Sequence, residues 1–142
     1  MTMVLFPDGI PIHSFEHRLR SRYSETDKMG YVYYGRYLEY FEQARTEMIR
    51  SMGVHYSTME KDGIMLPVIH SEIDYKHPLY YDEEIIIKVH VYAAPSVKLV
   101  TYYEVVAQER DQLCALGEVS LVFMNSVTRK PCRVPKYLLD AL

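Results

Sequence analysis

One strongly helical stretch lies in a chain whose other apolar patterns are mostly those of strands, and this combination limits the possible folds. Apolar side chains recur at steps of three and four residues along the stretch: Tyr37, Phe41, Ala44, Met48 and Met52. This spacing predicts a helix with one broad apolar face and one polar face. Gly53 follows the last of these residues and is expected to cap the helix. About sixteen residues make a helix of roughly 24 Å, long enough to cross a sheet.

The chain after this helix is predicted to be mostly strand, in the ranges 64–75, 84–92, 97–109 and 113–124. The range 84–92 alternates most clearly, with Ile85 and Ile87 on one side and Lys88 and His90 on the other. Turn residues separate the last three strands, and such short connections predict antiparallel pairing.

A further strand is expected before the helix, at about residues 15–24. There Leu19 and Tyr23 alternate with arginines and are predicted to be buried. One strand, one long helix and four strands in a meander predict an α+β fold in a single domain, residues 1–142. Its antiparallel five-stranded sheet would wrap around the helix. The open sheet edges favour pairing with a second copy.

Composition excludes several classes of protein. The chain has 142 residues, of which 49% are hydrophobic and 25% charged, as in ordinary globular proteins. It has no apolar run near 18 residues and no basic segment followed by a long apolar one at the N-terminus, so neither a membrane span nor a signal peptide is predicted, and a cytoplasmic location is expected. A net charge of −3 argues against a nucleic-acid binder. Cys114 and Cys132 have no motif spacing and are expected to be reduced thiols.

Asp27 is the acidic residue with the clearest chemical setting. It lies in the turn ETDKMG, a few residues before the helix begins. One interpretation is a turn residue whose carboxylate accepts hydrogen bonds from nearby N–H groups. The other is a catalytic carboxylate beside backbone amides that stabilise an oxyanion. Residues 32–36 lead into the helix, and Gly35 allows a ligand to approach the backbone closely.

Other candidate sites have less support from the sequence. His13 and His17 are four residues apart, but no carboxylate or cysteine set accompanies them, so no metal site and no cofactor are predicted. The chain contains neither a GxSxG motif nor a phosphate-binding loop. The tail carries a basic cluster that is either a solvated end of the chain or a clamp for a phosphate-bearing ligand: Arg129, Lys130, Arg133 and Lys136.

Three segments carry a resemblance to a known family. They are ETDKMGYVYYGRYLEYFEQARTEMIR, LPVIHSEIDYKHPLYYDEEIIIKV and GEVSLVFMNSVTRKPCRVP. The chain resembles, from about Phe15 to Leu138, the hotdog-fold acyl-CoA thioesterases of the 4-hydroxybenzoyl-CoA thioesterase type and the related Tol-Pal-associated thioesterases. The resemblance implies a hotdog fold, a homodimer or homotetramer with sites at the dimer interface, and a substrate that is an acyl-CoA or acyl-carrier-protein thioester.

The resemblance also implies roles for individual residues. Asp27 takes the position of the catalytic aspartate, which acts as a general base or as a nucleophile. Tyr34, with Gly35 beside it, takes the position whose backbone N–H polarises the thioester carbonyl. Contacts with the substrate are expected from four further residues: Tyr33, Arg36, Arg129 and Lys130.

Two positions and one hairpin depart from the family pattern. Many members have histidine where Tyr34 stands and asparagine where Arg36 stands, and the hairpin at residues 94–98 lacks the basic run that some members use for coenzyme A. Two alternatives to the thioesterase stay open. One is a hydratase or dehydratase of acyl thioesters on the same fold, and the other is a non-catalytic protein that binds acyl groups.

Overall fold

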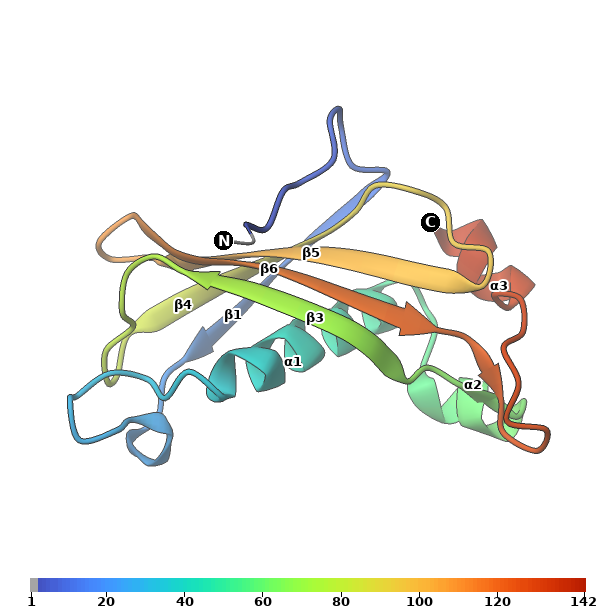
Figure 1. The fold of residues 1–142 in the computed structure, drawn as a ribbon, viewed down its shortest axis with the longest axis horizontal. Coiled ribbons are helices and arrows are strands. Elements are labelled where there is room, and N and C mark those ends of the chain that lie inside the picture. The colour runs from blue at the N-terminus through green and yellow to red at the C-terminus, as the bar shows by residue number, and fades with distance from the viewer. Residues whose placement is uncertain (1–2) are drawn as a thin grey trace.

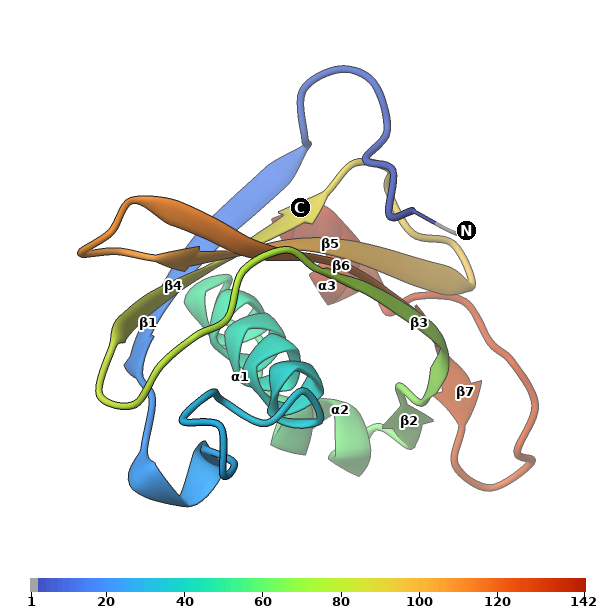
Figure 2. The ribbon, with the colours of Figure 1, turned by 60° about the vertical axis from the view of Figure 1, so that its left-hand side comes forward.

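A curved antiparallel sheet of five strands wraps around one long helix (Figures 1 and 2). The computed structural model describes residues 3–142. The strands of the main sheet, in their order across it, are β1 (His13–Arg20), β4 (Glu84–Val91), β5 (Lys98–Ala107), β6 (Gln112–Val122) and β3 (Val68–Tyr75). The long helix is α1 (Arg36–Ser51). The α+β class and the five-stranded sheet around a central helix are confirmed.

The smaller elements lie around the sheet and α1. They are the 3₁₀ turn η1 (Tyr23–Glu25), the helices α2 (Tyr56–Lys61) and α3 (Lys136–Ala141), and the paired short strands β2 (Ile64–Met65) and β7 (Met124–Asn125). Within residues 3–142, each helix is too short or too polar to cross a membrane.

The order of the strands corrects the predicted meander. β4, β5 and β6 are joined by hairpins as expected, but β3 pairs with β6 and not with β4. β1 pairs with β4 along its whole length, from His13 opposite Val91 to Arg20 opposite Glu84. Since β1 and β5 occupy both sides of β4, the open side of β6 is the place left for β3. The two edge strands are therefore β1 and β3.

Two predicted strand boundaries were also wrong. The first strand ends at Arg20, and the chain turns through η1, so Tyr23 is 79% exposed instead of buried. The turn η1 is closed by the Glu25 carboxylate, which accepts a hydrogen bond from the Arg22 N–H at 2.8 Å. The range 64–75 is two strands, separated at Pro67, because proline has no N–H to continue a ladder.

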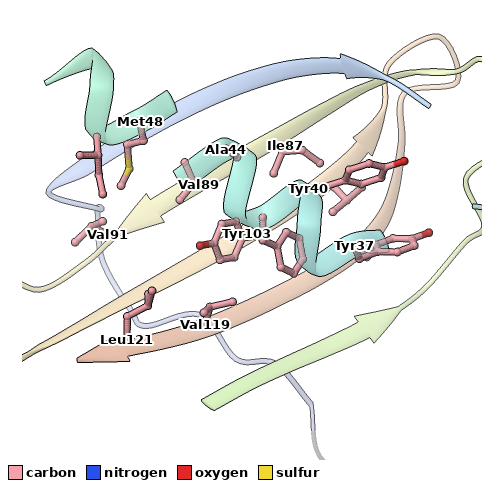
Figure 3. Close-up of a cluster of buried hydrophobic side chains, with 14 of the residues drawn as sticks. Tyr37, Tyr40, Ala44, Met48, Ile87, Val89, Val91, Tyr103, Val119 and Leu121 are labelled. Atoms are coloured by element: carbon pink, nitrogen blue, oxygen red, sulfur yellow. The ribbon is translucent and has the colours of Figure 1, made fainter. Parts of the chain in front are cut away.

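Helix α1 buries its apolar face against the concave side of the sheet. Figure 3 shows Tyr40, Ala44 and Met48 of α1 in one cluster with Ile87, Tyr103 and Val119 of the sheet. The rings of Phe41 and Tyr103 stack with their centroids 4.2 Å apart. Gly117 lies beneath Phe41, and a Cβ atom there would come within 2.4 Å of the Phe41 ring.

The two ends of α1 are set differently. Gly53, with φ of +83°, follows the C-cap Met52 and ends the helix close to where it was predicted. At the start, the N-cap is Gly35, which has a helical backbone conformation. The loop before Gly35 carries Asp27, so the packing of α1 on the sheet also fixes where that loop lies.

Candidate active site

A pocket of about 280 Å³ lies where the loop before α1 meets the end of β3. In Figure 1 both segments lie at the left-hand end of the molecule. The pocket is lined by Asp27, Met29, Tyr31, Val32, Tyr34, Tyr37, Tyr75, Lys76, His77 and Pro78. It brings together Asp27 and Tyr34, two of the three residues to which a catalytic role was assigned.

Asp27 uses one carboxylate oxygen to shape its own turn. Oδ1 accepts hydrogen bonds from the N–H groups of Met29 at 2.8 Å and Tyr31 at 3.2 Å. The Asp27 N–H donates to the Tyr31 carbonyl at 2.8 Å. Within residues 3–142, Oδ2 accepts no hydrogen bond. The turn interpretation of Asp27 is thus correct, and it leaves the second oxygen available for chemistry.

Two backbone amides next to the helix start are free donors. The Tyr34 and Gly35 N–H groups make no hydrogen bond to any part of the chain that the structure describes. The next two N–H groups along the chain are already hydrogen-bonded. The Arg36 N–H donates to the Tyr33 carbonyl at 2.9 Å, and the Tyr37 N–H donates to the Tyr34 carbonyl at 3.3 Å. Unpaired N–H groups at the positive end of a helix dipole favour a negative charge.

Tyr33 covers Gly35 and lies beside the pocket, not in its lining. A Cβ atom on Gly35 would approach Cε2 of Tyr33 to 2.8 Å. The φ of Gly35 is −67°, which any residue can adopt, so the reason for glycine at this position is steric. The ring of Tyr33 lies 4.6 Å from that of Tyr34. The expected substrate contact of Tyr33 remains a prediction.

Tyrosines form much of the pocket wall. Burial raises the pKa of both Tyr37 and Tyr75, so their hydroxyls are neutral donors near pH 7. The Tyr75 hydroxyl donates to the Tyr34 carbonyl at 3.2 Å, and the Tyr37 and Tyr75 rings meet edge to face at 5.1 Å. Tyr75 therefore ties the end of β3 to the segment that carries the free amides.

The sequence did not identify the contribution of β3 to this pocket. In the sequence, Tyr75 is only the end of the predicted strand 64–75, and no role is assigned to Lys76, His77 or Pro78. The N–H groups of Lys76 and His77 both donate to the Cys114 carbonyl, at 2.8 and 3.0 Å, which fixes this strand end against β6. Because the pairing of β3 with β6 was not predicted, its nearness to Asp27 could not be predicted either.

Arg36 has partners that explain a cation at the first position of a helix. Its Nη1 lies 3.0 Å from Oε2 of Glu39 in an ion pair, and its Nη2 donates to the Ser24 carbonyl at 3.4 Å. The carboxylate of Glu39 and the carbonyl of Ser24 offset the unfavourable interaction of Arg36 with the helix dipole. Arg36 does not line the pocket.

Arg129 and Lys130 lie away from Asp27 in the single chain. Both are exposed and belong to the loop after β7, which is at the opposite end of α1 from the Asp27 loop (Figure 1). One chain therefore does not bring these residues to the pocket, and their expected contact with the substrate would require a second copy.

Comparison with known proteins gives consistent matches. Residues 21–142 match the thioesterase-like superfamily. A Bacillus subtilis protein named "Putative acyl-CoA thioesterase YneP" is 42% identical over 76 residues, which cover 54% of this chain and 55% of that protein. The acyl-CoA thioester hydrolase YbgC of Escherichia coli O157:H7 is 26% identical over 88% of this chain and 92% of its own length. The crystal structure of a DHNA-CoA thioesterase from Staphylococcus aureus is 35% identical, with a TM-score of 0.83, covering 89% of this chain and 85% of that one.

Proposed function

This chain belongs to the thioesterase-like superfamily, and on that basis we propose that it hydrolyses an acyl-CoA thioester at the Asp27 pocket. The products are a carboxylic acid and free coenzyme A. The fold is the hotdog fold of this superfamily, and the protein is a thioester hydrolase. The family match over most of the chain supports a single domain.

One observation carries the assignment of the site. A carboxylate with one oxygen free of hydrogen bonds lines the same pocket as Tyr34, whose N–H is a free donor within the described residues. Hydrolysis of a thioester needs a group that activates water or attacks the carbonyl carbon, and it needs donors for the negative charge that develops on the carbonyl oxygen. Asp27 and the amides of Tyr34 and Gly35 supply these two requirements.

The reaction can begin in either of two ways. As a general base, Asp27 takes a proton from water, whose oxygen attacks the thioester carbon. As a nucleophile, Asp27 attacks that carbon itself, and water then hydrolyses the resulting anhydride. In both, the C–S bond breaks and coenzyme A leaves as the thiolate, while the Tyr34 and Gly35 amides stabilise the oxyanion.

Relatives favour coenzyme A over an acyl carrier protein on the thiol side of the substrate. The names of the Escherichia coli and Staphylococcus aureus proteins both specify a coenzyme A thioester. The acyl group must fit between the tyrosines of a pocket of about 280 Å³, which suits an aromatic or a short-to-medium aliphatic group.

A second copy and a reducing compartment complete the proposal. β3 is an edge strand with apolar side chains exposed at Val68 and Ile69, and strand edges of this kind favour pairing with another copy. We therefore expect a homodimer or homotetramer. Both cysteines are free, which fits a location in the cytoplasm, where thiols remain reduced.

The proposal is tested by measuring thiol release from a panel of aromatic and aliphatic acyl-CoA and acyl-carrier-protein thioesters. We expect turnover of at least one acyl-CoA. Hydration of an enoyl-CoA without release of thiol would identify a hydratase instead. Binding of acyl-CoA without any turnover, unaffected by substitution of Asp27, would identify a non-catalytic acyl-binding protein.

A further inference from the structure

Glu25 is a buried acid two residues before Asp27, and the proposed chemistry does not use it. Its residue is only 6% exposed, although it lies in the turn η1 at the edge of the molecule. A buried carboxylate is costly unless hydrogen bonds or a charge partner compensate for lost water. Its contacts therefore indicate what the fold gains from an acid at this position.

The Glu25 side chain connects η1 to the second turn of α1. Its Oε1 accepts hydrogen bonds from the Tyr40 hydroxyl at 2.9 Å and from the Arg22 N–H at 2.8 Å. Tyr40 is 2% exposed, and Figure 3 shows it on α1 beside Tyr37. Burial, and then the hydrogen bond to Glu25, raises the pKa of Tyr40, which keeps its hydroxyl a donor. Hydrogen bonds to a charged acceptor are among the stronger ones in proteins.

The Glu25 backbone holds the other side of the loop. Its carbonyl accepts a hydrogen bond from the Tyr33 N–H at 2.7 Å. Tyr33 immediately precedes Tyr34, whose amide is a proposed oxyanion donor. Asp27 lies between these two connected points, and Thr26 and Val32 form a further antiparallel bridge within the same loop.

We propose that Glu25 is the positioning residue that sets the Asp27 carboxylate relative to the Tyr34 and Gly35 amides, through the Tyr40 hydroxyl on one side and the Tyr33 N–H on the other. The inference rests on the proposed thioesterase function. Arg36 assists from the first turn of α1 by its hydrogen bond to the Ser24 carbonyl. Loss of the Glu25 to Tyr40 bond would let the loop shift on α1 while the core beneath Phe41 stays packed.

The test compares Tyr40→Phe with Tyr23→Phe, which also removes one hydroxyl from a tyrosine. Tyr23 is 79% exposed, and within residues 3–142 its hydroxyl makes no hydrogen bond. We expect Tyr40→Phe to lower kcat about tenfold or more with KM changed less than about threefold, since a displacement of roughly 1 Å can cost about 100-fold in rate. Tyr23→Phe should keep both constants. A folded Tyr40→Phe enzyme with unchanged kcat would overturn the proposal.

Two variants of Glu25 give a second test. Because the variants are compared with each other, the test stays informative if both proteins lose some stability. Glutamine keeps an oxygen that can accept from Tyr40 and Arg22, whereas alanine does not, so kcat should fall in the order wild type, Glu25→Gln, Glu25→Ala. Equal kcat values for Glu25→Gln and Glu25→Ala would contradict the positioning role.

Amide hydrogen exchange of residues 26–34 separates this inference from the proposed function. Exchange at Tyr33 should become faster in Tyr40→Phe and Glu25→Ala, but not in Tyr23→Phe. Wild-type protein that hydrolyses no thioester would overturn the proposed function. Unchanged exchange in every variant would overturn the anchoring by Glu25 whether or not the enzyme is active.

Discussion

Asp27 shows that one side chain can serve a turn and a reaction at the same time. Oδ1 holds the N–H groups of Met29 and Tyr31, which fixes the rotation of the carboxylate, and Oδ2 is free of hydrogen bonds within residues 3–142. A carboxylate already held in one orientation loses less conformational entropy when the substrate arrives. The turn and catalytic interpretations of Asp27 are therefore compatible.

Glu104 gives a prediction for pH at the residue scale. A hydrogen bond from His90 Nε2 at 2.8 Å lowers the pKa of Glu104 from its ordinary value of 4.5. Below that value the unfolded chain binds the proton more readily than the folded chain does. The stabilisation is thus fully present above pH 4.5 and is lost as the pH falls through the lowered pKa.

The measurement is the free energy of unfolding in urea as a function of pH. The free energy of unfolding of wild type should exceed that of Glu104→Gln above pH 4.5, and the difference between the two should shrink as the pH falls below this value. Glu104→Gln in a His90→Ala background, which lacks the hydrogen-bond donor, is the control and should show a smaller pH-dependent difference. A difference between wild type and Glu104→Gln that is constant with pH would contradict the role of the His90 hydrogen bond.

At the scale of elements, the contact between α1 and the sheet depends on a missing side chain. Phe41 packs between Tyr103 and Gly117, and a Cβ atom at Gly117 would come within 2.4 Å of its ring. Alanine in place of glycine in the middle of a strand usually stabilises by about 0.5–1 kcal/mol. Here the clash should reverse the sign.

We therefore expect Gly117→Ala to lower the free energy of unfolding by about 1–3 kcal/mol, as overpacking of a core does. Chemical denaturation measures this change. In a Phe41→Leu background, where the side chain at the contact is smaller, Gly117→Ala should lower the free energy of unfolding by less than it does in the wild-type background. A Gly117→Ala protein as stable as wild type would show that α1 does not depend on this close approach.

Local patterns predicted the elements better than their pairing. Helix α1 and strand β4 matched closely, because the spacing of their apolar residues has one clear period each. The position of β3 depends on which sheet edge remains open after β1 has paired with β4, and this competition among strands leaves no sign in any short stretch. Asp27, named from its turn, and Tyr34, named from the family resemblance, both line the pocket, and their catalytic roles stay predictions. Tyr75 and His77, which also line it, were missed because of that competition among strands.

At the scale of the whole molecule, the N-terminal arm fastens onto the sheet. The Val4 N–H donates to Oδ2 of Asp74 at 2.7 Å, and the Phe6 ring meets that of Tyr102 edge to face at 5.4 Å. Asp74 and Tyr102 belong to β3 and β5, so the arm connects strands that are not neighbours.

Removing the Phe6 ring should therefore weaken the fold as a whole. We expect Phe6→Ala to reduce the free energy of unfolding by about 2 kcal/mol, through loss of partly buried apolar area and of the aromatic contacts. Leu5→Ala is the matched control, because Leu5 is 72% exposed and its loss should cost little. Thermal unfolding of the two variants measures both changes, and equal melting temperatures would show that the Phe6 ring adds no more stability than the exposed Leu5 side chain.

The assembly of the molecule is open to a direct measurement. The loop after β7, which carries Arg129 and Lys130, lies at the opposite end of α1 from the loop that carries Asp27, and edge strand β3 exposes Val68 and Ile69. We expect sedimentation velocity to show a dimer or tetramer, and Ile69→Glu to shift it toward monomer because a charge on a paired edge is unfavourable. A wild-type protein that is a stable monomer would contradict the interface contact proposed for Arg129 and Lys130.

The most direct test of the account is the steady-state hydrolysis of an acyl-CoA by Asp27→Asn. Asparagine keeps an oxygen to accept the Met29 and Tyr31 N–H groups, so the turn and the fold should persist, as circular dichroism and the melting temperature can verify. Without the carboxylate, kcat should fall about 100-fold or more, the usual contribution of a general base. A folded Asp27→Asn enzyme that hydrolyses acyl-CoA at the wild-type rate would show that Asp27 is neither the general base nor the nucleophile.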